Sequence, residues 1–87
     1  MSIECYYCHR PPREIPEYRQ MAREYNENAN PDYRITSADV VIKEEGTYDA
    51  KTQLFSCTEC YIKHGMPLND DLFLAYRKYR REVKPLE

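Results

Sequence analysis

The sequence predicts a small α+β domain that is held together by two pairs of cysteines. The chain has 87 residues, enough for one domain (residues 1–87) whose apolar core alone is marginal. Its four cysteines form two identical C-x-x-C pairs, which supply the staple that so small a core needs. Two stretches of helical periodicity lie on either side of a β-branched run, and this mixture indicates the α+β class.

The first cysteine pair, Cys5 and Cys8, is followed by two consecutive prolines, Pro11 and Pro12. Prolines remove amide donors and fix the backbone, so a stiff connector is expected to leave this pair. A helix is then expected over residues 15–29, because its apolar residues recur on one stripe at about 100° per residue. We interpret this stripe as core packing, and it consists of Ile15, Tyr18, Met21, Ala22, Tyr25 and Ala29.

Strands and turns are expected over residues 33–56. Val40, Val41 and Ile42 are all β-branched, which favours a strand. Residues 52–56 are expected to form a second short strand, and the turn residues Gly46 and Asp49 lie between the two strands. The pattern therefore predicts a hairpin between the two cysteine pairs.

A final helix is expected over residues 69–84, with Asn69 as its N-cap. Acidic residues in the first turn and basic residues toward the other end suit the helix dipole. One face is predicted to pack on the core, and it carries Leu72, Tyr76, Tyr79 and Val83.

The cysteine spacing carries the strongest chemical signal in the sequence. Two intervening residues let a tight turn aim both sulfur atoms at one point, about 2.3 Å away in a zinc site. Two such turns place four soft anionic ligands in a tetrahedron, which suits zinc. The sequence therefore predicts one Zn²⁺ per chain, held by Cys5, Cys8, Cys57 and Cys60.

Two other uses of the same thiols stay open. Iron in a rubredoxin-like site has the same four ligands, and a thiol–disulfide function also uses C-x-x-C pairs. The N-terminus lacks a basic and apolar secretory leader, so we expect a cytoplasmic protein, where metal binding is commoner than structural disulfides. His9 and His64 are expected to stay outside the ligand set.

The order of the elements is that of a treble clef. A cysteine knuckle comes first, then a helix and a hairpin, and the second cysteine pair enters a short helical turn that Gly65 closes. A zinc-ribbon-like core, with both pairs on hairpin turns, is the alternative. In either case the C-terminal helix is an addition to the metal-binding core.

The sequence offers little to support catalysis. Four thiolates fill the coordination shell, whereas a catalytic zinc keeps one position open. Gly46 and Gly65 are the only glycines, too few for a glycine-rich phosphate loop. We therefore expect no enzymatic activity and no small-molecule substrate. No apolar run approaches the roughly 20 residues that span a bilayer, so no membrane association is expected.

A binding function remains, and we expect a protein partner, with the chain as an adaptor or regulator of a larger assembly. Tyrosine and arginine are enriched at interface hot spots. The outer face of the last helix is the candidate surface and carries Leu74, Arg77, Lys78 and Arg81. The alternative is a nucleic-acid-binding zinc domain, although the net charge of −2 does not favour it. Its candidate residues are Arg10, Arg13, Arg77, Lys78, Arg80, Arg81 and Lys84.

Overall fold

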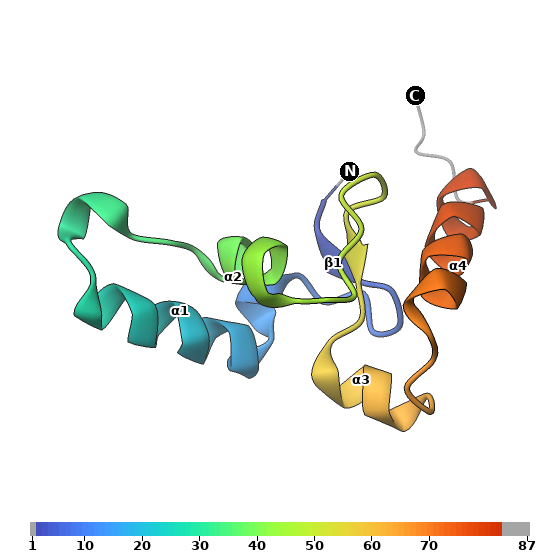
Figure 1. Cartoon of the computed structure of the whole chain (residues 1–87), viewed down its shortest axis with the longest axis horizontal. Coiled ribbons are helices and arrows are strands. Elements are labelled where there is room, and N and C mark those ends of the chain that lie inside the picture. Colours follow the sequence, from blue (N-terminus) through green and yellow to red (C-terminus); the bar gives the residue numbers. More distant parts are fainter. Residues whose placement is uncertain (1, 83–87) are drawn as a thin grey trace.

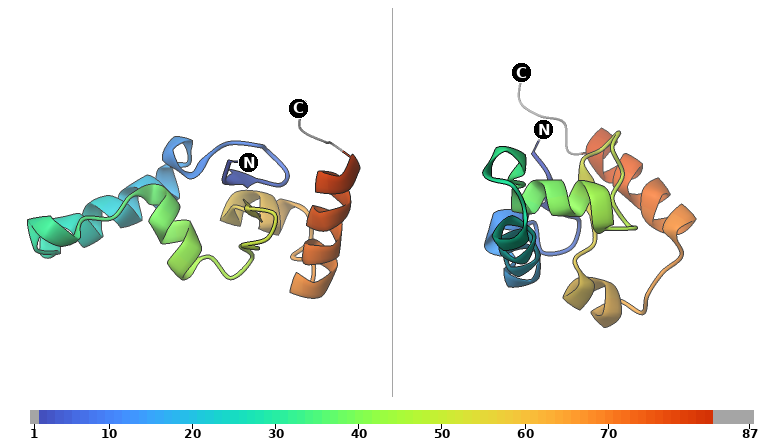
Figure 2. Two further views of the ribbon diagram at one scale, coloured as in Figure 1. Left: turned by 90° about the horizontal axis from the view of Figure 1, so that it is seen from above. Right: turned by 60° about the vertical axis from the view of Figure 1, so that its left-hand side comes forward.

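A computed structural model of the chain describes residues 2–82 and has the α+β class that the sequence predicts (Figure 1). Helices α1 and α4 lie at opposite ends of the long axis, and a two-stranded sheet lies between them (Figures 1 and 2). The molecule is flat, with extents of 42 × 34 × 19 Å. In chain order the elements are β1 (Glu4–Cys5), η1 (Pro12–Glu14), α1 (Pro16–Asn28), η2 (Pro31–Tyr33), α2 (Ser37–Glu44), β2 (Leu54–Phe55), α3 (Thr58–Lys63) and α4 (Asn69–Glu82).

The sheet is parallel, with Glu4 opposite Leu54 and Cys5 opposite Phe55. Parallel neighbours need a long crossover connection, and the segment that contains α1 and α2 provides it. An isolated antiparallel bridge joins Asp49 to Leu54 and closes a tight turn just before β2. The hairpin expected within residues 33–56 is therefore wrong: β2 pairs with the N-terminal strand, and only this tight turn precedes it.

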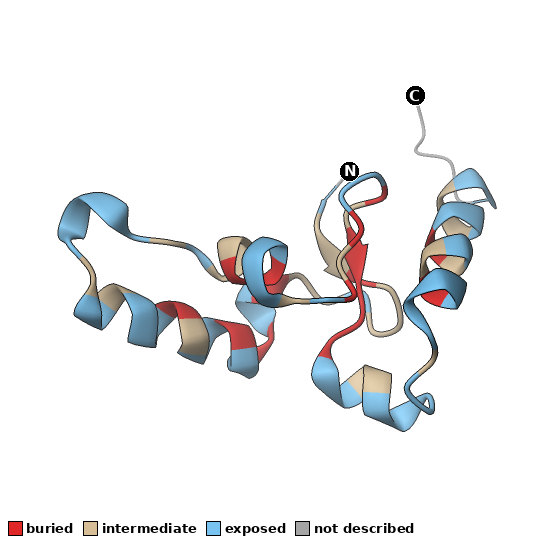
Figure 3. Ribbon diagram, in the orientation of Figure 1, coloured by how far each residue is buried: buried red, intermediate tan, exposed pale blue. Residues whose placement is uncertain are grey.

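Strand β2 divides the buried side chains into two groups (Figure 3). Leu54 and Phe55 are both fully buried, and neighbouring residues of a strand face opposite sides. Phe55 contributes to the group that we name the α1–α2 core: Cys5, Ile15, Tyr18, Ala22, Val40, Val41, Phe55 and Cys57. Leu54 contributes to the smaller α4 core: Leu54, Leu72 and Tyr76.

The first expected helix is confirmed as α1, although its apolar stripe is buried only in part. Tyr18 and Ala22 are buried, whereas Tyr25 is 48% exposed near the end of the helix. Beyond Tyr25, the Asn26 side chain accepts a bond from the Ile35 amide and donates one to the Ile35 carbonyl. These two hydrogen bonds attach the loop after α1 to the helix. They stabilise the C-terminal end of α1, where the apolar stripe is exposed.

The strand expected at Val40, Val41 and Ile42 is wrong, because these residues lie in α2. Thr36 caps α2 and accepts a bond from the Asp39 amide, and the Asp39 carboxylate accepts one from the Thr36 amide. This reciprocal capping box starts a helix locally. Val40 and Val41 then pack into the α1–α2 core, so burial outweighs the modest helix propensity of β-branched residues.

Helix α4 confirms the expected C-terminal helix as far as Glu82. Its first hydrogen bond runs from the Leu72 amide to the Leu68 carbonyl, and Asn69 is the first helical residue. The Asn69 side chain donates to the Gly46 carbonyl instead of capping the helix. Val83 and Lys84 lie outside the described residues. None of the helices in residues 2–82 is long and apolar enough to cross a bilayer.

Candidate metal centre

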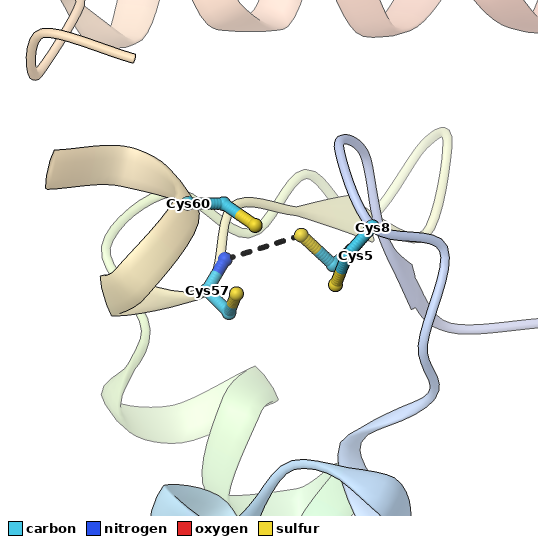
Figure 4. A group of neighbouring side chains, drawn as sticks. All are labelled: Cys5, Cys8, Cys57 and Cys60. Carbon is cyan, nitrogen blue, oxygen red and sulfur yellow. Dashed lines mark hydrogen bonds between the residues drawn. The ribbon is translucent and has the colours of Figure 1, made fainter. Parts of the chain in front are cut away.

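The four cysteines come from two short segments that the parallel sheet brings together (Figure 4). Cys5 ends β1 and Cys8 lies in the turn that follows, where His9 adopts a positive φ of 62°. Cys57 is the N-cap residue of α3, and Cys60 lies in the first turn of that helix. The pairing of Cys5 with Phe55 therefore sets the distance between the two pairs.

The sulfur atoms form one compact cluster and point toward a common space (Figure 4). All four lie within 4.8 Å of one another. Ligands about 2.3 Å from a tetrahedral ion lie about 3.8 Å apart, so an inward shift of about 1 Å or less would form the site. The cysteines are free thiols, and Cys5 and Cys57 are buried. The donor set thus fits a metal that prefers four thiolates.

Two hydrogen bonds to sulfur support this arrangement. The Cys57 amide donates to Cys5 Sγ at 3.4 Å, which links one pair to the other (Figure 4). The Arg10 guanidinium donates through Nε to Cys8 Sγ, also at 3.4 Å. Donors of this kind orient the ligands and stabilise the negative charge of thiolates. The sequence did not predict this contact between Arg10 and Cys8, and suggested Arg10 only as a candidate residue for nucleic-acid binding.

The protonation of the thiols differs with their surroundings. Burial raises the pKa of Cys57 and of Cys60. Burial also acts to raise the pKa of Cys8, but hydrogen bonds from Arg10 outweigh it and lower that pKa to about 7. A bound cation would supply the positive charge that the buried thiolates lack, since a coordinating thiol is deprotonated by its metal.

The two histidines lie beside the site and outside the cysteine cluster. His9 Nδ1 lies 2.8 Å from a Glu4 carboxylate oxygen. The His64 ring stacks on Tyr7, with ring centroids 3.9 Å apart and planes inclined by 6°. Tyr7 also packs against both the α1–α2 core and the α4 core. Both histidines have other partners, and neither belongs to the cluster of four cysteines.

The candidate binding face of α4 is exposed, and part of it lines a hollow. Leu74 is 65% exposed. The hollow has a volume of about 470 Å³ and is lined by Lys51, Thr52, Leu74, Arg77, Arg80 and Arg81. Of the residues predicted for this face, Lys78 is exposed but does not line the hollow. Lys51 and Thr52 were not predicted to belong to this face. They lie beside α4 because of the tight turn before β2, whose position relative to α4 the sequence did not reveal.

The arginines near the first cysteine pair do not extend this face. Arg10 lines a separate cavity with Cys57 and Glu59, and its guanidinium lies 3.9 Å from the Glu59 carboxylate. Arg13 lines another cavity beside the start of α2. The basic residues that sequence reasoning grouped for nucleic-acid binding therefore lie on different parts of the molecule.

The chain matches no protein-family model, no curated protein and no solved structure. Its function is therefore inferred from its own residues and geometry.

Proposed function

We propose that this chain is a small zinc-stabilised module that acts by binding a protein partner. The observation that carries the proposal is the cluster of four thiols within 4.8 Å, contributed by two C-x-x-C turns. Zinc is the metal of choice for a closed tetrahedral thiolate site. In this proposal Cys5, Cys8, Cys57 and Cys60 hold the ion, and the ion joins the N-terminal strand to α3.

The metal site has a structural role in this proposal, and the surface of α4 has the binding role. A closed four-thiolate shell leaves no position for a substrate or an activated water, so no catalytic step is assigned. The exposed Leu74 beside Arg77 and Arg81 offers the combination of apolar and basic groups that interfaces use. The role is that of an adaptor or regulator of a larger assembly, in the cytoplasm.

Two alternatives use the same residues differently. Nucleic-acid binding would use the basic end of α4 for phosphate contacts and would show a steep salt dependence. Thiol–disulfide exchange would use Cys8, because a pKa of about 7 gives a nucleophilic thiolate near neutral pH. That lowered pKa equally suits a thiol that binds metal.

Elemental analysis of the untagged chain by mass spectrometry is the direct test. We expect one zinc per chain, and its loss in a Cys57→Ser/Cys60→Ser variant. One iron per chain would preserve the four-cysteine site but change the metal. A folded, reduced chain that contains no metal would contradict the proposal and favour the thiol–disulfide alternative.

The binding role needs a second experiment. Partners that co-purify from a native lysate should survive nuclease treatment if the contact is between proteins. The Cys57→Ser/Cys60→Ser variant should lose them, because the module no longer folds. Complete loss of partners after nuclease treatment would instead support the nucleic-acid alternative.

A further inference from the structure

The hollow beside α4 is built from two segments that are far apart in sequence. Leu74, Arg77 and Arg81 follow one another at intervals of three and four residues, so they share one face of the helix. Lys51 and Thr52 come from the tight turn that the Asp49–Leu54 bridge closes. Among the residues that line the hollow, Thr52 is buried, whereas Leu74 is 65% exposed.

Interactions within the chain hold one of the basic side chains in place. Arg80 donates to the Thr52 carbonyl at 2.9 Å and to the Ser2 carbonyl at 3.3 Å, and it lies 3.8 Å from Glu4. These contacts connect α4 to the turn and to the N-terminal segment. Arg80 therefore fixes the shape of the hollow and has little capacity left for a ligand.

The other three basic side chains are available to a partner. Arg77 is 47% exposed, and its nearest carboxylate is that of Asp49, 3.9 Å away. Lys51 and Arg81 are exposed, and neither forms an ion pair with another side chain in residues 2–82. The rim of the hollow thus has a local excess of positive charge around an exposed leucine, although the whole chain has a net charge of −2.

We propose that this hollow binds an acidic segment of the partner protein, in which an apolar side chain contacts Leu74 and neighbouring carboxylates pair with Lys51, Arg77 and Arg81. The inference rests on the proposed protein-binding function and defines the chemistry of the partner. Charge complementarity selects the acidic residues, since arginine pairs well with carboxylates. The exposed leucine selects the apolar one, since its burial contributes favourably to binding.

A nucleic acid fits this hollow less well. Proteins that bind single strands stack bases on exposed aromatic rings, and the hollow is lined by none. Tyr79, on the same helix, packs instead against Tyr6 and His9, with ring centroids 5.8 and 5.7 Å away. Arg10 and Arg13 lie at other cavities, so the described residues provide a compact basic hollow and no long basic track.

A random peptide library displayed on phage, selected on the zinc-loaded chain, tests the proposal without assuming a motif. We expect the enriched peptides to combine aspartate or glutamate with an apolar residue. Binding of the synthesised peptides, measured by fluorescence anisotropy, should weaken roughly tenfold or more with Lys51→Glu/Arg81→Glu. Leu74→Ser should weaken binding several-fold without changing its salt dependence.

Matched variants separate this result from a general effect of charge or folding. Arg19→Glu/Arg23→Glu reverses two exposed basic side chains on α1, the same change in net charge at a distant face, and should leave binding unchanged. Lys51→Gln/Arg81→Gln removes the charges without adding carboxylates near Asp49, and it replaces the reversal variant if that variant loses its zinc.

Three outcomes would overturn the inference, and they bear differently on the proposed function. Enriched peptides that lack acidic residues, or that bind the charge variant normally, would place the binding face elsewhere and leave the proposed function intact. Failure of every peptide to enrich would count against both. Tight, salt-sensitive binding of a labelled single-stranded oligonucleotide without any peptide binding would replace both with the nucleic-acid alternative.

Discussion

The two cores of this molecule are stabilised by different means. The α1–α2 core is the larger and is mostly apolar, and it contains two of the proposed metal ligands, Cys5 and Cys57. The α4 core has three buried residues, with tyrosines and Phe73 packed around them. Side chains that bond to backbone carbonyls, from Asn69 and Arg80, supplement it. Apolar packing and the proposed metal site therefore stabilise one side of the sheet, whereas hydrogen bonds from side chains to backbone carbonyls help to stabilise the other.

A series of polar contacts connects the two cores. Tyr18 donates to the Glu45 carboxylate at 2.6 Å, and Thr47 donates to the other oxygen of Glu45 at 2.9 Å. The Ser56 amide donates to the Thr47 hydroxyl, and the Ser56 hydroxyl lies 2.7 Å from that of Tyr76. Every fully buried side-chain polar atom in the described residues has a partner. A satisfied network of this kind makes the two cores depend on each other.

Metal removal should have the largest effect and should disrupt both cores. The apparent binding free energy of structural zinc, about 10–16 kcal/mol, is comparable to the whole stability of a small domain. Strand β1 contains Cys5 of the first cysteine pair, and β2 directly precedes the second pair. Because both strands lie between the cores, neither core should persist without the ion. We expect a chelator to abolish the cooperative thermal transition seen by circular dichroism, and added Zn²⁺ to restore it.

The same measurement can contradict this view of the metal. A chelated, reduced chain that keeps its helical signal and melting temperature would show that packing alone is sufficient. A chain that loses the signal of α1 and α2 while α4 stays protected from hydrogen exchange would show that the cores are independent.

Truncation of either buried residue of β2 should have the next largest effect. Phe55→Ala removes a fully buried ring from the α1–α2 core and should cost about 3–5 kcal/mol, whereas Leu54→Ala should cost about 2–5 kcal/mol in the α4 core. Hydrogen exchange should accelerate first in α1 and α2 for Phe55→Ala, and first in α4 for Leu54→Ala. Equal acceleration in all helices for both variants would mean that the division into two cores has no energetic basis.

High pH should weaken both cores through their buried tyrosines. Burial raises the pKa of Tyr18, as does its bond to Glu45, and burial raises the pKa of Tyr76. Both stay protonated in the folded chain after they ionise in the unfolded chain, at a pKa near 10. Their contribution is therefore complete below pH 10 and is lost as the pH rises above it, by up to about 1.4 kcal/mol per pH unit for each tyrosine.

Denaturant titrations between neutral pH and pH 11 would measure this loss. Tyr18→Phe and Tyr76→Phe should each be less stable at neutral pH, because a hydrogen bond is lost, and should show a shallower decline above pH 10. Tyr33, which is 69% exposed, provides the control, since Tyr33→Phe should leave the alkaline decline as it is in the wild type. An unchanged slope in both core variants would exclude these tyrosines as its source.

The sequence was informative where the signal is local. The periodicity of residues 15–29 and the charge distribution of residues 69–84 predicted α1 and α4, since both signals depend on spacing within one helix. The C-x-x-C spacing is likewise local to each cysteine pair and predicted that the four thiols cluster, although it is the parallel pairing of β1 with β2 that brings the two pairs together. The parallel pairing of β1 with β2 and the position of Lys51 beside α4 depend on contacts across the whole chain. No local pattern encodes those contacts.

The wrong prediction of a strand where α2 lies is an error of a different kind, because the sequence did contain a local signal for the helix. The β-branched run Val40, Val41 and Ile42 favoured a strand, but Thr36 and Asp39 have the spacing of a capping box. The competing propensities differ by fractions of a kcal/mol per residue, and a capping residue contributes about 1 kcal/mol. Burial of Val40 and Val41 against α1 then stabilises the helix further.

Thr36→Ala tests this explanation and should have the smallest effect of the four changes. It removes the oxygen that accepts from the Asp39 amide at 3.2 Å, so we expect a loss of about 1 kcal/mol. Hydrogen exchange should accelerate in α2 while α4 keeps its protection, because the cap belongs to the α1–α2 side. Ser37→Ala, at the first position of the same helix, should change stability far less. If the two variants lose equal stability, tertiary packing rather than the capping box selects the helix over the strand.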